Sequence, residues 1–242
     1  MGYVNPAINE GLADVEALAL IMADASGTMA EIELRTGEQK SLCVAWMIQE
    51  FLNALDDPQY QDTFVTLAFF SADRDGVKIV SVLEEHNAYT LKTYSDNTDL
   101  TIWDGLSPQN RAQGMGGRTP IGTALAWARK RAEEWVNAAT GQVPRRCVIY
   151  LLSDGMNTYG PDGMEERAAI EAFNASCENG NIRLATIGYF QTQEGEGTRP
   201  DEEAGRRFLR ALPLNKDAYF EADNTQAIVR YILSTMTQVM KV

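Results

Sequence analysis

The chain has 242 residues, of which 45% are hydrophobic and 23% charged, the balance of a folded globular protein. Its 34 acidic residues outnumber its 21 basic ones, giving a formal net charge of −13, and no basic stripe occurs. These charges exclude nucleic acid and anionic membrane surfaces as expected partners. No apolar run is long enough to span a bilayer, and the start of the chain lacks the pattern of a secretory signal.

The predicted elements begin with a continuous apolar run at 17–23 that stops at Asp24. A run that is apolar on both faces is typical of a central parallel strand. Apolar residues at helical spacing predict a helix over 38–55. Two further strands are predicted at 63–70 and 77–83.

A long polar stretch at 84–118 follows and is predicted to be a loop. The next elements are a helix at 120–138, with Pro120 in its first turn, a buried strand at 146–153 and a helix at 163–179. The last expected elements are, in order, a strand at 182–190, an acidic loop at 191–203, a short helix to 211, a strand at 217–222 and a helix at 224–240.

Strands and helices therefore alternate along the whole chain. Alternation predicts an α/β fold with a single doubly wound, mostly parallel sheet and helices on both of its faces. No internal repeat or linker interrupts the pattern, so we expect one domain over residues 14–242. Residues 1–13 are interpreted as an N-terminal extension.

The cysteines and the histidine limit the chemistry. Cys43, Cys147 and Cys177 form an odd, widely spaced set in apolar contexts, which indicates buried thiols in a reducing compartment and predicts a cytoplasmic location. His86 is the only histidine, so His-rich zinc sites are excluded. It is expected in a loop or at a strand end, and no GxSxG motif accompanies it.

Ligands of open α/β sheets bind beyond the carboxyl ends of the strands, and five oxygen-bearing side chains are predicted to lie there. They are Asp24, Ser26, Thr28, Thr119 and Asp154. Carboxylates and hydroxyls without imidazole or thiolate suit Mg²⁺, and alternatively Mn²⁺ or Ca²⁺. If the hydroxyls contact the ion and the carboxylates act through water, the ion keeps much of its charge and attracts an outside carboxylate.

Three motifs resemble those of von Willebrand factor A domains. Asp24-Ala-Ser-Gly-Thr28 is similar to their DxSxS signature, GGRTPIGTAL to their Thr-containing loop, and LLSDGMNT to their second-Asp strand end. The closing YFEADNTQAIVRYI also resembles their last strand and helix, so the likeness runs over about residues 15–240. Thr28 departs from the usual Ser, and the stretch between Met29 and the first helix is longer than usual.

The resemblance implies a Rossmann-like fold with a metal-ion-dependent adhesion site (MIDAS). Ser26, Thr28 and Thr119 would then be direct or near-direct ligands, while Asp24 and Asp154 would act largely through water. A partner's Glu or Asp would complete the coordination of Mg²⁺. Intracellular relatives often work beside AAA+ ATPases or in stress-response systems, so the resemblance implies a protein partner of that kind and no enzyme activity.

Each residue also has a purely structural interpretation. Asp24 could bond its own turn, Thr119 could cap the following helix, and Asp154-Gly155 could form an ordinary strand-end turn. Convergence of all five oxygens favours the metal site over these separate explanations.

The alternative function is a Mg²⁺-dependent phosphohydrolase or phosphotransferase of haloacid-dehalogenase type. Its DxDGT loop is similar to Asp24-Ala-Ser-Gly-Thr28, so Asp24 would be the nucleophile and Asp154 a metal ligand. The residue expected to act as acid and base is Ser26, whose hydroxyl cannot hold a proton for transfer near neutral pH. The sequence therefore favours the binding module, with a recognition face expected at 29–37, 104–118 and 155–163.

Overall fold

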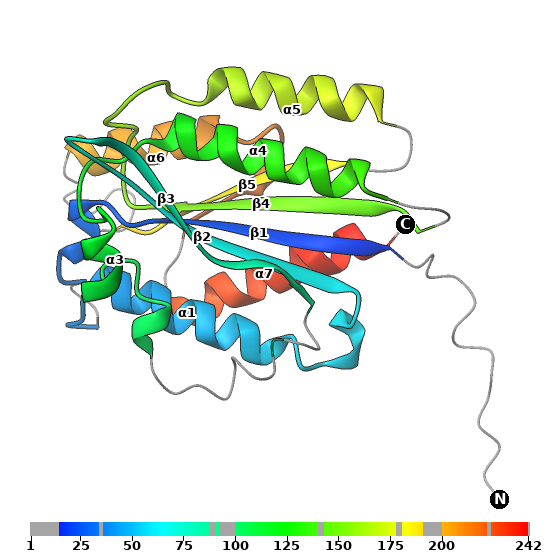
Figure 1. Cartoon of the computed structure of the whole chain (residues 1–242), viewed down its shortest axis with the longest axis horizontal. Coiled ribbons are helices and arrows are strands. Elements are labelled where there is room, and N and C mark those ends of the chain that lie inside the picture. The colour runs from blue at the N-terminus through cyan, green and yellow to red at the C-terminus, as the bar shows by residue number, and fades with distance from the viewer. Residues whose placement is uncertain are drawn as a thin grey trace, which may run out of the picture.

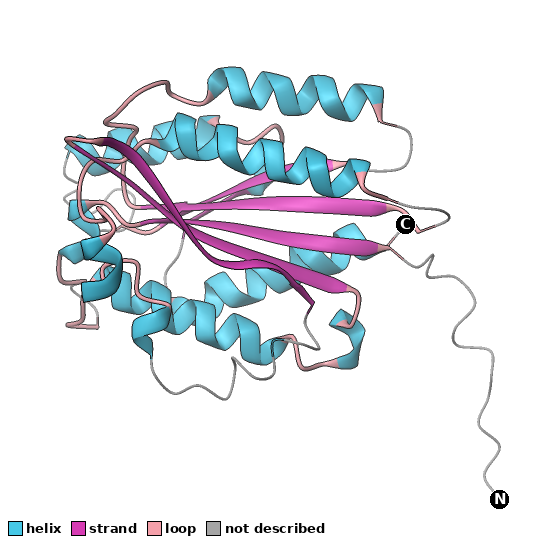
Figure 2. Cartoon of the chain, in the orientation of Figure 1, coloured by secondary structure: helices cyan, strands magenta, loops and turns pink. Residues whose placement is uncertain are grey.

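One six-stranded sheet forms the centre of the protein, in the order β3-β2-β1-β4-β5-β6 (Figure 1). The computed structural model describes residues 15–33, 36–87, 91, 100–139, 143–177, 181–190, 200–221 and 224–241. Helices cover both faces of the sheet, as Figure 2 shows. This confirms the predicted doubly wound α/β fold, whereas the predicted extension at 1–13 lies outside the described residues.

The central strand is β1 (Glu16–Asp24), as the apolar run predicted. It pairs in parallel with β2 (Thr63–Asp73) on one side and β4 (Arg145–Ser153) on the other. Ala23 is aligned with Leu152 of β4, so β1 and β4 end almost level with each other. The residues that follow these two strands are therefore neighbours at one edge of the sheet.

The outer strands complete the sheet on both sides. β3 (Gly76–Asn87) returns antiparallel along β2, while β5 (Ile182–Gly188) and β6 (Tyr219–Glu221) extend it in parallel beyond β4. The carboxyl ends of the parallel strands all lie at the left end of Figure 1. His86 is the penultimate residue of β3, which confirms its predicted place at a strand end.

Two helices, α1 (Lys40–Ala54) and α7 (Thr225–Met240), pack side by side under one face of the sheet (Figure 1). Both are amphipathic, and each turns a buried apolar stripe toward the strands. Tyr150 of β4 ties α7 to the sheet, because its hydroxyl donates to the carbonyl of Ile232 at 3.1 Å.

The other face is covered by α4 (Ile121–Asn137), α5 (Met164–Ser176) and α6 (Pro200–Ala211). The buried side chains of this layer form a second apolar core, separate from the one beneath the sheet. Among the described residues, no helix combines the length and apolarity needed to cross a bilayer.

The prediction of one polar loop over 84–118 is wrong in part. β3 continues to Asn87, a short helix α3 (Pro108–Ala112) follows later, and Trp103 is fully buried in the core. The Trp103 indole donates to Gln49 Oε1 of α1 at 2.8 Å, so this stretch is anchored against the helix layer. A single aromatic residue in a polar segment gives no periodic pattern, so hydrophobic periodicity could not predict the burial of Trp103. Residues 88–90 and 92–99 lie outside the described part.

The acidic loop predicted at 191–203 is also corrected. α6 begins at Pro200, so residues 200–203 are helical, and Glu202 is buried. Pro in the first turn and three acidic residues after it are favourable at a helix N-terminus. The acidic run that indicated a solvated loop thus starts a helix. Residues 191–199 lie outside the described residues.

The buried indole gives a stability prediction. Trp103→Ala removes a fully buried aromatic side chain and its hydrogen bond to Gln49, so the free energy of unfolding should fall by about 3–5 kcal/mol. Trp46→Ala is the control, because Trp46 on α1 is 36% exposed and should cause a clearly smaller loss. Urea denaturation measures both, and equal losses would contradict an anchoring role for Trp103.

Candidate functional site

The carboxylate of Asp24 closes the turn after β1 and also reaches the neighbouring strand. Its Oδ1 accepts a hydrogen bond from the Ser26 backbone N–H at 2.8 Å, and its Oδ2 accepts one from Ser153 Oγ at 2.6 Å. Asp24 is only 2% exposed. The turn interpretation is therefore right, and the same carboxylate locks the end of β1 to the end of β4.

A chain of oxygens continues from this turn to Asp154. Ser26 Oγ lies 3.1 Å from Thr28 Oγ1, and Thr28 Oγ1 donates to Asp154 Oδ1 at 2.9 Å. Thr28 and Asp154 are 126 residues apart in the sequence. The structure thus places Asp24, Ser26, Thr28 and Asp154 in one cluster, as the strand-end argument predicted.

Thr119 lies with Thr28 and Asp154 at a small cavity, which Asp24 and Ser26 do not line. The cavity has a volume of about 170 Å³, and its lining includes Thr28, Thr119 and Asp154. The helix-capping interpretation of Thr119 is wrong, because α4 has Pro120 as its N-cap and no side-chain cap hydrogen bond. Instead, Thr158 holds the Thr119 backbone. The Thr158 hydroxyl accepts a hydrogen bond from the Thr119 N–H at 2.8 Å, and the Thr158 N–H donates to the Thr119 carbonyl at 2.9 Å.

Close backbone contacts hold the Thr119 loop against the first turn. The N–H of Gly27 donates to the carbonyl of Gly117, and that of Gly116 donates to the carbonyl of Ala25, both at 2.8 Å. A Cβ at Gly117 would lie 1.9 Å from the carbonyl oxygen of Ala72. Glycine is therefore required at 117 for the Thr119 loop to lie against the end of β2.

Sequence reasoning missed Lys40, the first residue of α1. Its Nζ donates to Asp154 Oδ2 at 2.5 Å and to Glu31 Oε2 at 3.3 Å, and the residue is 3% exposed. Burial alone would lower the pKa of Lys40, but the charge and hydrogen bond of Asp154, with Glu31, raise it above its ordinary value. The sequence did contain a sign of this contact: Lys40 is a charged residue one helical turn before Val44, on the buried apolar stripe of α1.

The charge of Asp154 disfavours ionisation of the nearby, buried Asp24. Burial, followed by the charge of Asp154, raises the pKa of Asp24 to about 7, although hydrogen bonds from Ser153 and Ser26 oppose the shift. Because both carboxylates lie at the same edge with little access to water, a positive charge nearby stabilises their ionised forms. The site is therefore electrostatically suited to a cation.

The donor set determines which cations fit. Within the described ranges, no three or more His, Cys, Asp or Glu side chains come together as a possible metal cluster. A metal at this edge would have to use the hydroxyl oxygens of Ser26, Thr28 or Thr119 beside the two carboxylates. Such hard oxygens fit Mg²⁺, Mn²⁺ or Ca²⁺ rather than a soft metal.

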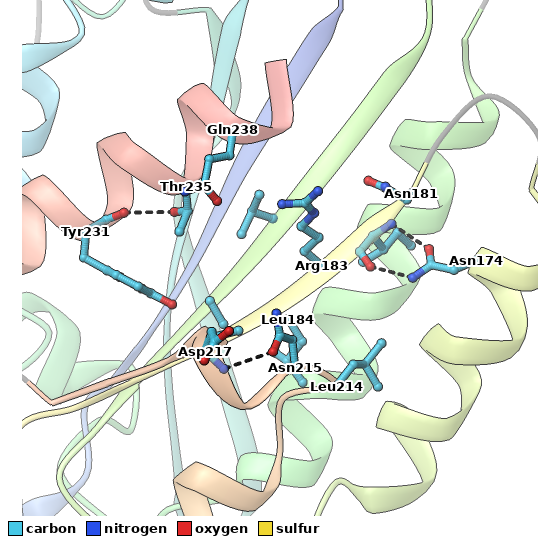
Figure 3. Close-up of a pocket in the computed structure, with 14 residues that line it drawn as sticks. Asn174, Asn181, Arg183, Leu184, Leu214, Asn215, Asp217, Tyr231, Thr235 and Gln238 are labelled. Atoms are coloured by element: carbon cyan, nitrogen blue, oxygen red, sulfur yellow. Dashed lines mark hydrogen bonds between the residues drawn. The ribbon is translucent and has the colours of Figure 1, made fainter. Parts of the chain in front are cut away.

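A larger cavity, of about 430 Å³, lies toward the opposite ends of the strands (Figure 3). It is bounded by the first half of β5 and by α7 from its middle onward, with Tyr231, Thr235 and Gln238 on the helix side. Asn174 bonds the backbone of Ile182 in its wall. None of the five predicted site residues lines this cavity, so it is separate from the cluster around Asp154.

Comparison with known proteins identifies the fold. No family model and no curated protein matches the sequence. Among solved structures, the chain is similar to proximal thread matrix protein 1 of the mussel byssus with a zinc-occupied MIDAS motif, with 16% identity and a TM-score of 0.57 over 92% of this chain. The pilus adhesin SpaC of Lactobacillus rhamnosus GG has 17% identity and a TM-score of 0.59 over 94% of this chain. Manganese-loaded TRAP protein of Plasmodium vivax has 16% identity and a TM-score of 0.54 over 90%.

The fold is therefore of the von Willebrand factor A type, which confirms the fold that the resemblance implied. The chain spans 48% of the mussel protein, 31% of the adhesin and 72% of the TRAP protein.

The contact at Gly117 can be tested by substitution. Gly117→Ala should destabilise the fold by about 1–3 kcal/mol, because the added methyl group forces the Thr119 loop away from Ala72. Gly155→Ala is a matched control beside Asp154, since no atom lies within 4 Å of the added Cβ, and it should stay within about 0.5 kcal/mol of the wild type. Denaturation midpoints measure both. Wild-type stability of Gly117→Ala would contradict the close approach of the Thr119 loop to β2.

Proposed function

We propose that the chain is a metal-dependent protein-binding module. One observation carries the proposal: hydroxyl- and carboxylate-bearing residues from three separate loops come together at the carboxyl edge of a von Willebrand factor A-type sheet. Ser26, Thr28 and Thr119 would hold the ion through their hydroxyls, and Asp24 and Asp154 would act mainly through water. When bound, the ion supplies a positive charge that can accept a carboxylate from a partner.

Mg²⁺ is the ion we propose, with Mn²⁺ or Ca²⁺ as alternatives. The oxygen-only donor set supports a hard dication. Two similar structures, the mussel matrix protein and the Plasmodium TRAP protein, are named for zinc and manganese, respectively, which supports a divalent metal without selecting magnesium.

The partner we propose is a protein that presents a Glu or Asp to the metal. Exposed Met156 and the acidic residues Glu31 and Asp201 line the same cavity, so the ligating carboxylate must enter past negative charge. The chain as a whole carries −13, and a partner surface that is neutral or basic around the carboxylate avoids long-range repulsion. An AAA+ ATPase or a component of a stress-response complex is the class of partner that the resemblance supports.

A cytoplasmic location belongs to the same proposal. Cys43 and Cys147 are buried free thiols, and Cys177 is free as well, which supports a reducing environment.

The haloacid-dehalogenase alternative is disfavoured by the state of Asp24. A nucleophilic carboxylate needs an oxygen open to the phosphate. Both oxygens of Asp24 accept hydrogen bonds, from Ser26 and Ser153, and the residue is 2% exposed. We therefore expect no turnover across a panel of small phosphate esters, and turnover lost in Asp24→Ala would contradict the binding-module proposal.

The metal site is tested through Thr119. Thr119→Val keeps the shape of the side chain and removes its hydroxyl oxygen, so Mn²⁺ affinity in calorimetry should fall by about tenfold or more. Thr237→Val is the matched control, because Thr237 lies near the end of α7 and bonds the Leu233 carbonyl far from the cluster. Unchanged Mn²⁺ binding in Thr119→Val would remove Thr119 from the site.

Partner capture is the second test. A pull-down from source cells with Mg²⁺ present should recover a partner that EDTA releases and that Thr119→Val recovers poorly. Thr237→Val should recover the same partner as the wild type. Capture that is indifferent to both EDTA and Thr119→Val would contradict a role for the metal in recognition.

A further inference from the structure

We infer that Lys40 is an internal cation that competes with the metal ion for Asp154, so that the site exchanges between a lysine-held state and a metal-held state. This inference rests on the proposed metal site and adds a regulatory residue to it. It follows from three features of the described residues: the position of the Lys40 ammonium, its burial, and the location of a second carboxylate beside it.

The first feature is the position of the ammonium. Asp154 Oδ1 accepts a hydrogen bond from Thr28 Oγ1 at 2.9 Å, and Asp154 Oδ2 accepts one from Lys40 Nζ at 2.5 Å. The proposed ligand hydroxyl and the ammonium therefore share one carboxylate. A dication near Thr28 would lie within a few ångströms of a fixed positive charge, and like charges at that separation oppose each other strongly in a buried site.

The second feature is burial. Lys40 is 3% exposed, and Asp154 is also buried, so water screens their interaction poorly. A buried lysine without a carboxylate partner would favour its neutral form, and a buried carboxylate without a cation would do the same. Each group thus stabilises the charge of the other, which makes the ammonium a substitute for the metal's positive charge.

The third feature is an alternative partner for the lysine. Lys40 Nζ also lies 3.3 Å from Glu31 Oε2, and the Glu31 side chain is 44% exposed. The flexible four-carbon stem allows the ammonium to turn from Asp154 toward Glu31 and solvent without losing an ion-pair partner. A metal ion can therefore displace Lys40 from Asp154 without leaving a buried, unpaired ammonium.

Charge balance agrees with an exchange between the two states. Without metal, the Lys40 ammonium is shared by the carboxylates of Asp154 and Glu31. With a dication bound and Lys40 turned to Glu31, the three carboxylates of Asp24, Asp154 and Glu31 match the three positive charges. The metal therefore has to displace Lys40 from Asp154, and Lys40 weakens metal binding.

Lys40→Met tests the competition, because it keeps most of the apolar stem and removes the charge. Calorimetric titration with Mn²⁺ should give a dissociation constant roughly tenfold or more below that of the wild type, since a like charge within about 4–6 Å shifts ionic equilibria by one or more orders of magnitude. Lys130→Met removes the same charge from a side chain that is 76% exposed on α4 and should leave the constant unchanged. Lys40→Arg retains the charge and should not tighten binding.

Thermal unfolding supplies a readout independent of the titration. Without metal, Lys40→Met should melt below the wild type, because Asp154 has lost its buried partner. Added Mg²⁺ should raise the melting temperature of Lys40→Met by more than it raises that of the wild type. If Lys40→Met folds poorly, Lys40→Gln replaces it, because glutamine keeps a polar group against Asp154. It too should have a lower melting temperature than the wild type without metal and a larger increase with Mg²⁺.

The outcomes separate the inference from the proposed function. Equal Mn²⁺ affinity in the wild type, Lys40→Met and Lys40→Gln would overturn the competition and leave the metal site intact. Weaker binding in the two uncharged variants would also overturn it, because Lys40 would then be supporting the site. Absence of Mn²⁺ binding in the wild type and in both variants would overturn the metal site itself, together with the inference. Binding seen only after removal of the charge would support both.

Discussion

Two buried carboxylates at the ends of adjacent parallel strands are stabilised by a positive charge beside them. The rest of the site depends on this interaction. Asp24 and Asp154 are brought together because β1 and β4 pair in parallel and end level, with Ser153 bonding Asp24 across the strands. Water reaches neither group easily. In the structure the charge comes from Lys40, and in the proposed function a dication takes over that role.

The fold explains why distant parts of the sequence can serve one site. Parallel pairing directs the loops after β1 and β4 to the same edge of the sheet, and the Gly-rich stretch before α4 reaches that edge through backbone contacts with the first turn. The Thr28 hydroxyl then bonds Asp154, and Thr119 of a second loop lines the same cavity, whose lining holds no histidine or cysteine. In the proposed function, this combination would leave a bound hard ion short of negative charge, so that the ion could recruit an acidic ligand.

Much of this arrangement could be predicted from the sequence because it depends on local patterns. The apolar run before Asp24 and the alternation of elements are properties of short segments, and the strand-end rule then brings Asp24, Ser26, Thr28 and Asp154 together. Trp103 and Lys40 could not be placed with the same rules. Trp103 packs against α1 from a segment without periodicity, and Lys40 finds its partner 114 residues away. A charged residue on an apolar helical stripe was the one available sign of that contact.

The most direct measurement is anomalous diffraction at the manganese edge from crystals grown with Mn²⁺. The account predicts a single strong peak bordered by the hydroxyl oxygens of Thr28 and Thr119 and by Asp154, with the Lys40 ammonium turned toward Glu31. Absence of a peak there, with Lys40 still bonded to Asp154 at saturating Mn²⁺, would contradict it.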